Sequence, residues 1–320
     1  MNPVVQCVPN ISEGKDLLKI AYITEPLKNK KGFKLISVEP DQDYNRSVIT
    51  LIGDPQSMIE PLLEFFNRAV EKIDMNLHKG EHARMGAVDV VPFIPISGIT
   101  IDECVDYAIQ LAKQVSSRFN LPIFLYAKAA QMPSRVNLPD IRKGEFEGMS
   151  EKIKDPEWKP DFGPQIMHPT FGVVAIGARI PLIAYNIDLN TTDEKIANSI
   201  AKAIRQSSGG FQYIQAGPVF LQERNHVQIT MNILDFKKNP IYRIFETVQM
   251  EAKRYQVEVT GSEVVGLLPK DALLDSIKYY MGMHQLSYDK KMSISNLVDA
   301  SIRYLKLRDF NELKIIEANL

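Results

Sequence analysis

Val227-Gln228-Ile229-Thr230-Met231-Asn232-Ile233-Leu234 is the clearest secondary-structure signal in the chain. Every second side chain from Val227 to Ile233 is apolar, and the side chains between them are polar. Successive side chains of a strand point to opposite faces of its sheet, so this pattern predicts a strand with one buried face. Such strands are typical of antiparallel sheets. We therefore expect an antiparallel sheet here, with its apolar face covered.

The elements around this strand are expected in a regular order. In the second half, strands are predicted at residues 173–178, 182–187, 211–221, 227–234 and 257–265, and helices begin at the cap Thr191/Glu194 and at Asn239-Pro240. In the first half, strands are predicted at residues 4–8, 33–38, 47–52, 87–95 and 121–126, and helices at residues 16–27, after Asp54-Pro55, and at 100–115 with the capping box Thr100/Glu103.

A strand–helix–strand–strand–helix–strand order thus occurs twice, which is typical of a ferredoxin-like unit. The predicted fold class is α+β, with two similar ferredoxin-like (β-α-β-β-α-β) subdomains that have antiparallel or mixed sheets and outer helices. The expected domains are residues 1–179 and 180–320. Residues 132–168 lie between the halves and are too long for a plain connection, so we expect a functional segment there. Helices after Lys270 are expected to serve packing or oligomer contacts.

Composition narrows the class of protein. The 320 residues are 45% hydrophobic and 24% charged, as in globular proteins, and the length favours two domains. The net charge of −1 gives no general attraction to nucleic acid or to an anionic membrane. We find neither a secretory leader nor an apolar run long enough to span a membrane. The two cysteines, Cys7 and Cys104, are expected to be reduced, and the protein is expected to be cytoplasmic.

The segment His78-Lys79-Gly80-Glu81-His82-Ala83-Arg84-Met85-Gly86 is the densest group of reactive side chains. It includes the pattern H-x-x-E-H of one class of zinc peptidases, which requires both histidines on one helical face. Gly80 disfavours that helix and an apolar strand follows within a few residues, so the zinc hydrolase is the least favoured enzyme hypothesis. A solvated polar loop is the other alternative. A loop between regular elements is also a common place for catalytic groups.

Several long motifs resemble the formiminotransferase domain family, in order along nearly the whole chain. They are CVPNISEG at residues 7–14, Asn45-Arg46, HKGEHARMGAVDVVPFIP at 78–95, residues 134–145, PDFGPQIMHPTFGVVAIGAR at 160–179, and GSEVVGLLP at 261–269. The resemblance implies two ferredoxin-like subdomains. It also implies a one-carbon (formimidoyl) transferase of histidine degradation, which moves the formimino group from N-formimino-L-glutamate to the N-5 of tetrahydrofolate.

The resemblance also implies site residues and partners. The family's catalytic histidine corresponds to His82. Its folate-binding stretch corresponds to Gly163, Pro164, Gln165, Ile166, Met167, His168, Pro169, Thr170, Phe171 and Gly172. Tetrahydrofolate is the expected co-substrate, and no metal is expected. A homodimer is expected, with a separate cyclodeaminase acting on the product, because this chain ends before the second domain of the animal proteins.

Chemistry supports these assignments. Transfer requires one proton to leave the attacking nitrogen and another to reach the departing glutamate nitrogen, and a histidine can exchange both near neutral pH. Arginine pairs bidentately with carboxylates, so we expect Arg84, Arg46 and Arg179 to include the substrate-carboxylate ligands. Phe171 either stacks on the folate or packs in the core, and His168 is more simply a structural residue.

The preferred substrate stays open at this point. Relatives often have proline, aspartate and threonine where this chain has Ala83, Glu39 and Val174. Some family members use 5-formyltetrahydrofolate as a formyl donor to glutamate, and this reaction is the main alternative function.

Overall fold

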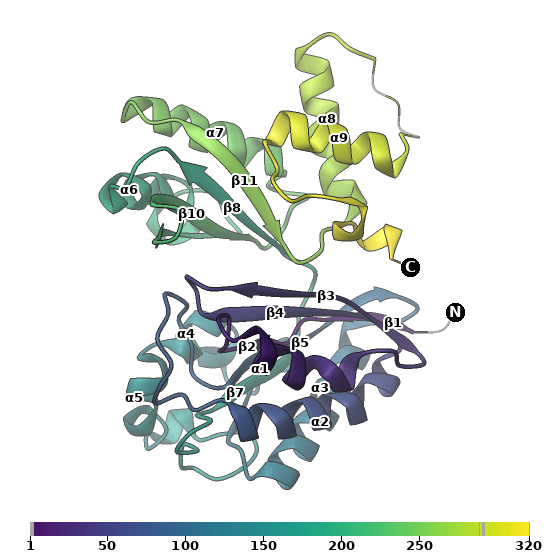
Figure 1. Ribbon diagram of the computed structural model, residues 1–320, viewed down its shortest axis with the longest axis vertical. Helices are drawn as coiled ribbons and strands as arrows, with labels where there is room; N and C mark the ends of the chain where they lie inside the picture. Colours follow the sequence, from purple (N-terminus) through teal and green to yellow (C-terminus); the bar gives the residue numbers. More distant parts are fainter. Residues whose placement is uncertain (1–2, 288, 290–291, 320) are drawn as a thin grey trace. The chain divides into compact units, whose positions relative to one another are not determined.

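The computed structural model describes residues 3–287, 289 and 292–319. The chain divides into two compact units, Met1–Ile180 and Pro181–Leu320, and each is described by itself. Among the described residues, no helix combines the length and apolar character needed to cross a bilayer. Both units combine helices with one sheet each, so the predicted α+β class is confirmed (Figure 1).

A seven-stranded sheet forms the centre of the first unit. Its strand order is β3, β4, then β1 and β2 in line, β5, β7 and β6. All pairings from β3 to β5 are antiparallel, whereas β7 runs parallel to both β5 and β6. The strands are β1 (Val4–Cys7), β2 (Asn10–Ile11), β3 (Phe33–Asp41), β4 (Arg46–Gly53), β5 (Val88–Ser97), β6 (Ile123–Ala127) and β7 (Val174–Ala178).

Three helices cover one face of this sheet (Figure 1): α1 (Leu17–Thr24), α2 (Pro55–Lys72) and α3 (Ile101–Phe119). Asp54 caps α2 by accepting a hydrogen bond from the Ser57 amide at 2.8 Å. Thr100 and Glu103 form the predicted capping box at the start of α3. The apolar side of each helix therefore packs on strands whose buried residues form one continuous core.

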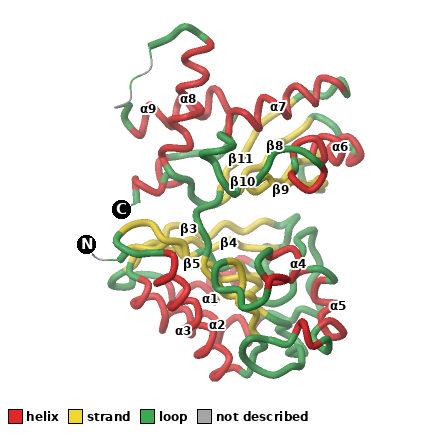
Figure 2. Tube along the Cα trace, turned by 180° about the vertical axis from the view of Figure 1, so that it is seen from behind, coloured by secondary structure: helices red, strands yellow, loops and turns green. Residues whose placement is uncertain are grey.

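Two short helices, α4 (Leu138–Arg142) and α5 (Glu145–Lys152), lie within the long segment 132–168 (Figure 2). Ile141 of α4 and Met149 of α5 belong to a second apolar cluster with Met85, Val90 and Val173. Val90 lies in β5, Val173 directly precedes β7, and Met85 lies in the segment that precedes β5. The long connection is thus a folded cover next to the segment that contains His82.

The second unit has a four-stranded, fully antiparallel sheet in the order β11, β8, β10, β9. Val227, Ile229, Met231 and Ile233 of β10 are 0–3% exposed, so the predicted apolar face is confirmed. The elements are β8 (Ile183–Leu189), α6 (Glu194–Ile204), β9 (Ile214–Leu221), β10 (His226–Ile233), α7 (Ile241–Arg254), β11 (Val259–Val265), α8 (Lys270–Met283) and α9 (Ile294–Leu305). The last two confirm the predicted C-terminal helices.

Some local predictions were wrong. The strand at 173–178 was grouped with the second half, but β7 completes the first sheet by pairing with β5 and β6. Asp193, not Thr191, caps α6, because its carboxylate accepts from the Lys195 amide while the Thr191 hydroxyl accepts from the Asp193 amide. Asn239 does not cap α7; its side-chain amide donates to the Gln212 carbonyl instead.

Candidate active site

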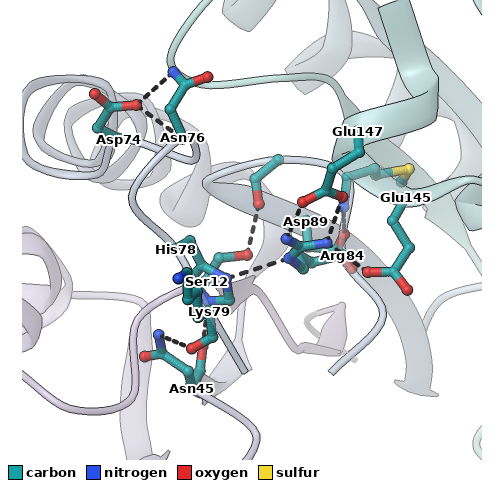
Figure 3. Close-up of polar contacts among 12 residues, drawn as sticks. Ser12, Asn45, Asp74, Asn76, His78, Lys79, Arg84, Asp89, Glu145 and Glu147 are labelled. Atoms are coloured by element: carbon teal, nitrogen blue, oxygen red, sulfur yellow. Dashed lines mark hydrogen bonds and ion pairs between the residues drawn. The ribbon is translucent and has the colours of Figure 1, made fainter. Parts of the chain in front are cut away.

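His82 lies in a segment of turns and bends between α2 and β5. Hydrogen bonds to other parts of the same chain fix this segment along its length. The Glu81 amide donates to the Asp43 carbonyl at 3.1 Å, and the Met85 amide donates to the Asp89 carboxylate at 2.8 Å. The Ser12 hydroxyl donates to the Gly86 carbonyl at 2.8 Å. A segment without regular structure is therefore held by one short-range and two long-range hydrogen bonds, and Figure 3 shows those of Ser12 and Asp89.

The predicted folate segment, residues 163–172, is hydrogen-bonded to both ends of the His82 segment. At one end, the Met75 amide donates to the Thr170 carbonyl at 2.8 Å. At the other, the Ala87 amide donates to the Phe171 carbonyl at 2.8 Å, and the Val173 amide donates to the Met85 carbonyl at 3.0 Å. Two segments that are about ninety residues apart in sequence thus form one structural element.

Gly172 is required by this contact between segments. Its φ is +83°, and a Cβ added there would lie 2.2 Å from the Met85 carbonyl oxygen. Any other residue would combine a left-handed backbone conformation with a clash against backbone. Gly172 thus allows close approach of the His82 segment.

His82 is half-buried and surrounded by positive charge. Burial is the main cause that lowers the pKa of His82 well below its usual value, and the guanidiniums of Arg46 and Arg142 lower it further. Smaller contributions to that lowering come from His78 and Arg84. The imidazole is therefore neutral at neutral pH, which is the form that accepts a proton.

Arg46 is the guanidinium with the least complete set of partners at this site. Its Nε atom is buried and has no hydrogen-bond partner among the described residues. The guanidinium carbon lies 5.3 Å from the centre of the Tyr44 ring, and burial lowers the pKa of Arg46. A buried donor without a partner costs free energy unless a ligand satisfies it. Arg46 therefore has the properties of a carboxylate ligand beside His82.

Arg84 is already bound by carboxylates of this chain. Its two Nη atoms donate to the Glu147 carboxylate at 2.8 and 2.6 Å, and Nη1 also donates to Glu145 (Figure 3). Its Nε donates to His78 Nδ1 at 3.2 Å. Arg84 is 6% exposed. The predicted binding of a substrate carboxylate by Arg84 in a bidentate mode would require displacement of Glu147.

Arg179, the third predicted carboxylate ligand, lies at the end of β7. Its amide donates to the Phe93 carbonyl at 3.1 Å, and Nη1 donates to the Ile180 carbonyl at 3.2 Å. Burial lowers the pKa of Arg179, and the neighbouring Tyr126 raises it. Its role stays a prediction.

The predicted folate segment has an exposed part and a buried part. Gly163, Gln165, Ile166 and Pro169 are exposed, and Ile166 is 72% exposed. Phe171 is fully buried beside Phe66, with ring centres 6.3 Å apart, which agrees with the core-packing alternative for this ring. His168 Nδ1 accepts from the Phe171 amide at 3.0 Å, which gives this histidine a structural role.

The zinc peptidase geometry is not formed. Neither His78 nor His82 lies in a helix, so they do not share a helical face. Both ring nitrogens of His78 have partners, Arg84 at Nδ1 and the Asn45 carbonyl at Nε2. Over the described residues, no group of three or more His, Cys, Asp or Glu side chains is arranged to hold a metal ion. The pattern H-x-x-E-H therefore lacks the helix that its zinc chemistry requires.

Family models match both halves of the chain. Residues 4–179 match the model of the formiminotransferase domain, N-terminal subdomain, and residues 184–319 match that of the formiminotransferase domain. The chain belongs to the formiminotransferase family. The predicted resemblance is thereby confirmed.

Relatives of this formiminotransferase chain differ in how much of their length the match covers. Glutamate formimidoyltransferase from Streptococcus pyogenes serotype M1 is 45% identical over 93% of this chain and 100% of its own length. The protein of the same name from Thermoplasma acidophilum is 43% identical over 88% of this chain and 93% of its length. Formimidoyltransferase-cyclodeaminase from Rattus norvegicus is 40% identical over 89% of this chain but only 54% of that protein.

Two residues of this formiminotransferase site were missed by sequence reasoning. Asp89 is 1% exposed and accepts from both the Met85 amide and the Arg142 guanidinium. Its signal was a single carboxylate inside the apolar run Val88-Asp89-Val90-Val91, since a buried charge needs a partner. Asn45 was noted only as part of a resembling pair, although its backbone and side chain bind three other residues.

Proposed function

We propose that this formiminotransferase is a glutamate formimidoyltransferase, which transfers the formimino group of N-formimino-L-glutamate to the N-5 of tetrahydrofolate. The observation that carries the proposal is the 45% identity to a relative of that name, over that relative's full length. The site supports it, because a neutral histidine lies beside a buried guanidinium that lacks a hydrogen-bond partner for Nε among the described residues.

His82 is proposed as the proton-transfer residue. The N-5 nitrogen attacks the amidine carbon and forms a new carbon–nitrogen bond, which gives a tetrahedral intermediate. The neutral imidazole takes the proton that N-5 must lose and returns it to the glutamate nitrogen, whose bond to carbon then breaks. The proton count balances, with formiminotetrahydrofolate and glutamate as products. A positioned acid–base group of this kind contributes roughly 10²- to 10⁴-fold in rate.

The first unit is proposed to hold both the catalytic histidine and the folate segment, within residues 1–179, while residues 180–320 form the second subdomain. Hydrogen bonds between the His82 segment and residues 170–173 support this division. We infer that both units are ferredoxin-like. The strand order β11-β8-β10-β9 and the order β3-β4-β1-β5 support that inference.

The remaining family expectations stay predictions. They are a cytoplasmic location, a homodimer, and a separate cyclodeaminase that consumes the product. The fused rat relative, whose name combines the two activities, supports a functional link between them.

A steady-state assay tests the function directly. Purified protein is given tetrahydrofolate with formiminoglutamate, or glutamate with 5-formyltetrahydrofolate. We expect kcat/KM for the formimino reaction to exceed that for the formyl reaction. Faster formyl transfer would assign the chain to the alternative reaction of this family, and no transfer in either assay would contradict the proposal.

Arg46 is proposed to bind a carboxylate of formiminoglutamate. Arg46→Met removes a charged donor worth about 1.5–3 kcal/mol, so the KM for formiminoglutamate should rise by about 10- to 100-fold. The matched control is Arg118→Met, whose guanidinium forms an exposed pair with Glu60. An unchanged KM in Arg46→Met would contradict the assignment.

A further inference from the structure

A continuous chain of hydrogen bonds runs from α5 to the turn before β4 (Figure 3). The Glu147 carboxylate accepts from Arg84, Arg84 Nε donates to His78 Nδ1, and His78 Nε2 contacts the Asn45 carbonyl at 2.8 Å. His78 and Arg84 flank His82 on either side in the sequence. The chain therefore ties together both ends of the segment that carries the proposed catalytic histidine.

The tautomer of His78 follows from its partners. Arg84 Nε–H can only donate, so His78 Nδ1 must accept and its proton must lie on Nε2. The Nε2–H group then donates to the Asn45 carbonyl, which can only accept. Burial lowers the pKa of His78, and the charge of Arg84 lowers it further. His78 is thus a neutral link with both nitrogens in use.

Asn45 extends the connection to two further points. Its backbone has a φ of +46°, a conformation that asparagine adopts more readily than most residues. The side-chain carbonyl accepts from the Gly14 amide at 2.9 Å, and the side-chain amide donates to the Lys79 carbonyl at 2.8 Å. Lys79 and Arg84 are therefore both fixed, and only residues 80–83 lie between them.

The donors of Arg84 are nearly all occupied. A guanidinium has five N–H donors, and four of them are used, one at Nε, two at Nη1 and one at Nη2. The planar fork that would bind a carboxylate bidentately already holds Glu147. A substrate carboxylate would find one free N–H group.

We propose that Arg84 and His78 are positioning residues, which hold the His82 segment in its reactive conformation through Glu147 and Asn45, and that Arg84 does not bind substrate. This inference rests on the proposed function for its kinetic consequences. It assigns the substrate carboxylate to other residues, with Arg46 the candidate beside His82. A displacement of about 1 Å at a reacting group can cost about 100-fold in rate.

Kinetics of four variants test the proposal. His78→Phe keeps a ring but loses both hydrogen bonds, so kcat should fall by about 100-fold with the KM for formiminoglutamate changed less than about threefold. His78→Gln retains one acceptor and one donor and should recover much of the loss. Glu147→Gln should lower kcat as well. The matched control on the same helix is Glu151→Gln, whose carboxylate pairs with Lys154.

The opposite result identifies Arg84 as a substrate ligand. If Glu147 only occupies the position of a substrate carboxylate on Arg84, Glu147→Gln frees the guanidinium. The KM for formiminoglutamate should then fall without loss of kcat. That outcome would overturn the proposal, and so would near-normal kcat in His78→Phe.

Hydrogen exchange measured by mass spectrometry provides a readout that needs no activity. His78→Phe and Glu147→Gln should exchange faster at residues 79–83, where the Glu81 amide is protected by the Asp43 carbonyl. Glu151→Gln should not. Unchanged exchange in His78→Phe would overturn the proposed positioning role of His78 and Arg84. An inactive wild type would contradict only the proposed function, and the exchange measurement would still test the positioning role.

Discussion

Replacement of His82 by glutamine is expected to lower kcat by about 10²- to 10⁴-fold. Glutamine approximates the size and hydrogen-bonding capacity of histidine, but it cannot accept and return a proton near neutral pH. The KM values should change little, because the proposed role concerns the transition state. Steady-state rates with formiminoglutamate and tetrahydrofolate measure the effect, and near-normal turnover would show that another group transfers the proton.

The pH profile of the wild type makes this prediction more specific. In the proposed mechanism the neutral imidazole of His82 is the active base, and burial lowers its pKa well below 6.5. The kcat/KM of the wild type should therefore stay constant as the pH falls through 6.5 and should decline only well below that pH. His82→Gln should lack that decline. His284→Gln is the control, because this exposed histidine stacks on Tyr304 in the second unit.

Asp89→Ala is expected to lower the free energy of unfolding by about 3–5 kcal/mol. Asp89 is 1% exposed, and its loss leaves the guanidinium of Arg142, itself only 17% exposed, without its carboxylate partner. The Met85 amide also loses its acceptor. Breaking a buried pair from one side is costly because the remaining charge stays buried.

Urea unfolding followed by circular dichroism measures this loss. The control is Glu60→Gln, which removes an exposed partner of Arg118 and should leave the midpoint almost unchanged. If Asp89→Ala had as small an effect as the control, the buried pair of Asp89 and Arg142 would not contribute to stability, which would contradict the prediction.

Local patterns predicted most of the fold. A run rich in β-branched and apolar residues predicted β4, a period-two apolar pattern predicted β10, and short-range capping signals predicted the starts of α2 and α3. The sheet to which β7 belongs was not predictable in this way. Its sequence, VAIGA, is apolar on both faces because it lies between two parallel neighbours, and such a run indicates a strand without indicating its partners.

The candidate site was predictable as a segment but not as a network. A high density of histidine, glutamate and arginine marked residues 78–86, and the resemblance singled out His82. The partners of Arg84 lie 61 and 63 residues further along the chain, and Arg142 is 53 residues from Asp89. Sequence patterns report neighbours within a few residues, so an arginine engaged by distant glutamates looked like one available to a ligand.

The close contact of Gly172 with Met85 has a consequence for how this family can change. The two strips of backbone fit only as a matched pair, because a methyl group at residue 172 would already collide with the neighbouring carbonyl. Loop grafting between distant relatives should therefore transplant residues 78–87 together with 163–173. Changes in substrate choice would then require both segments to change together, because either segment transplanted alone would pack against a backbone of different conformation.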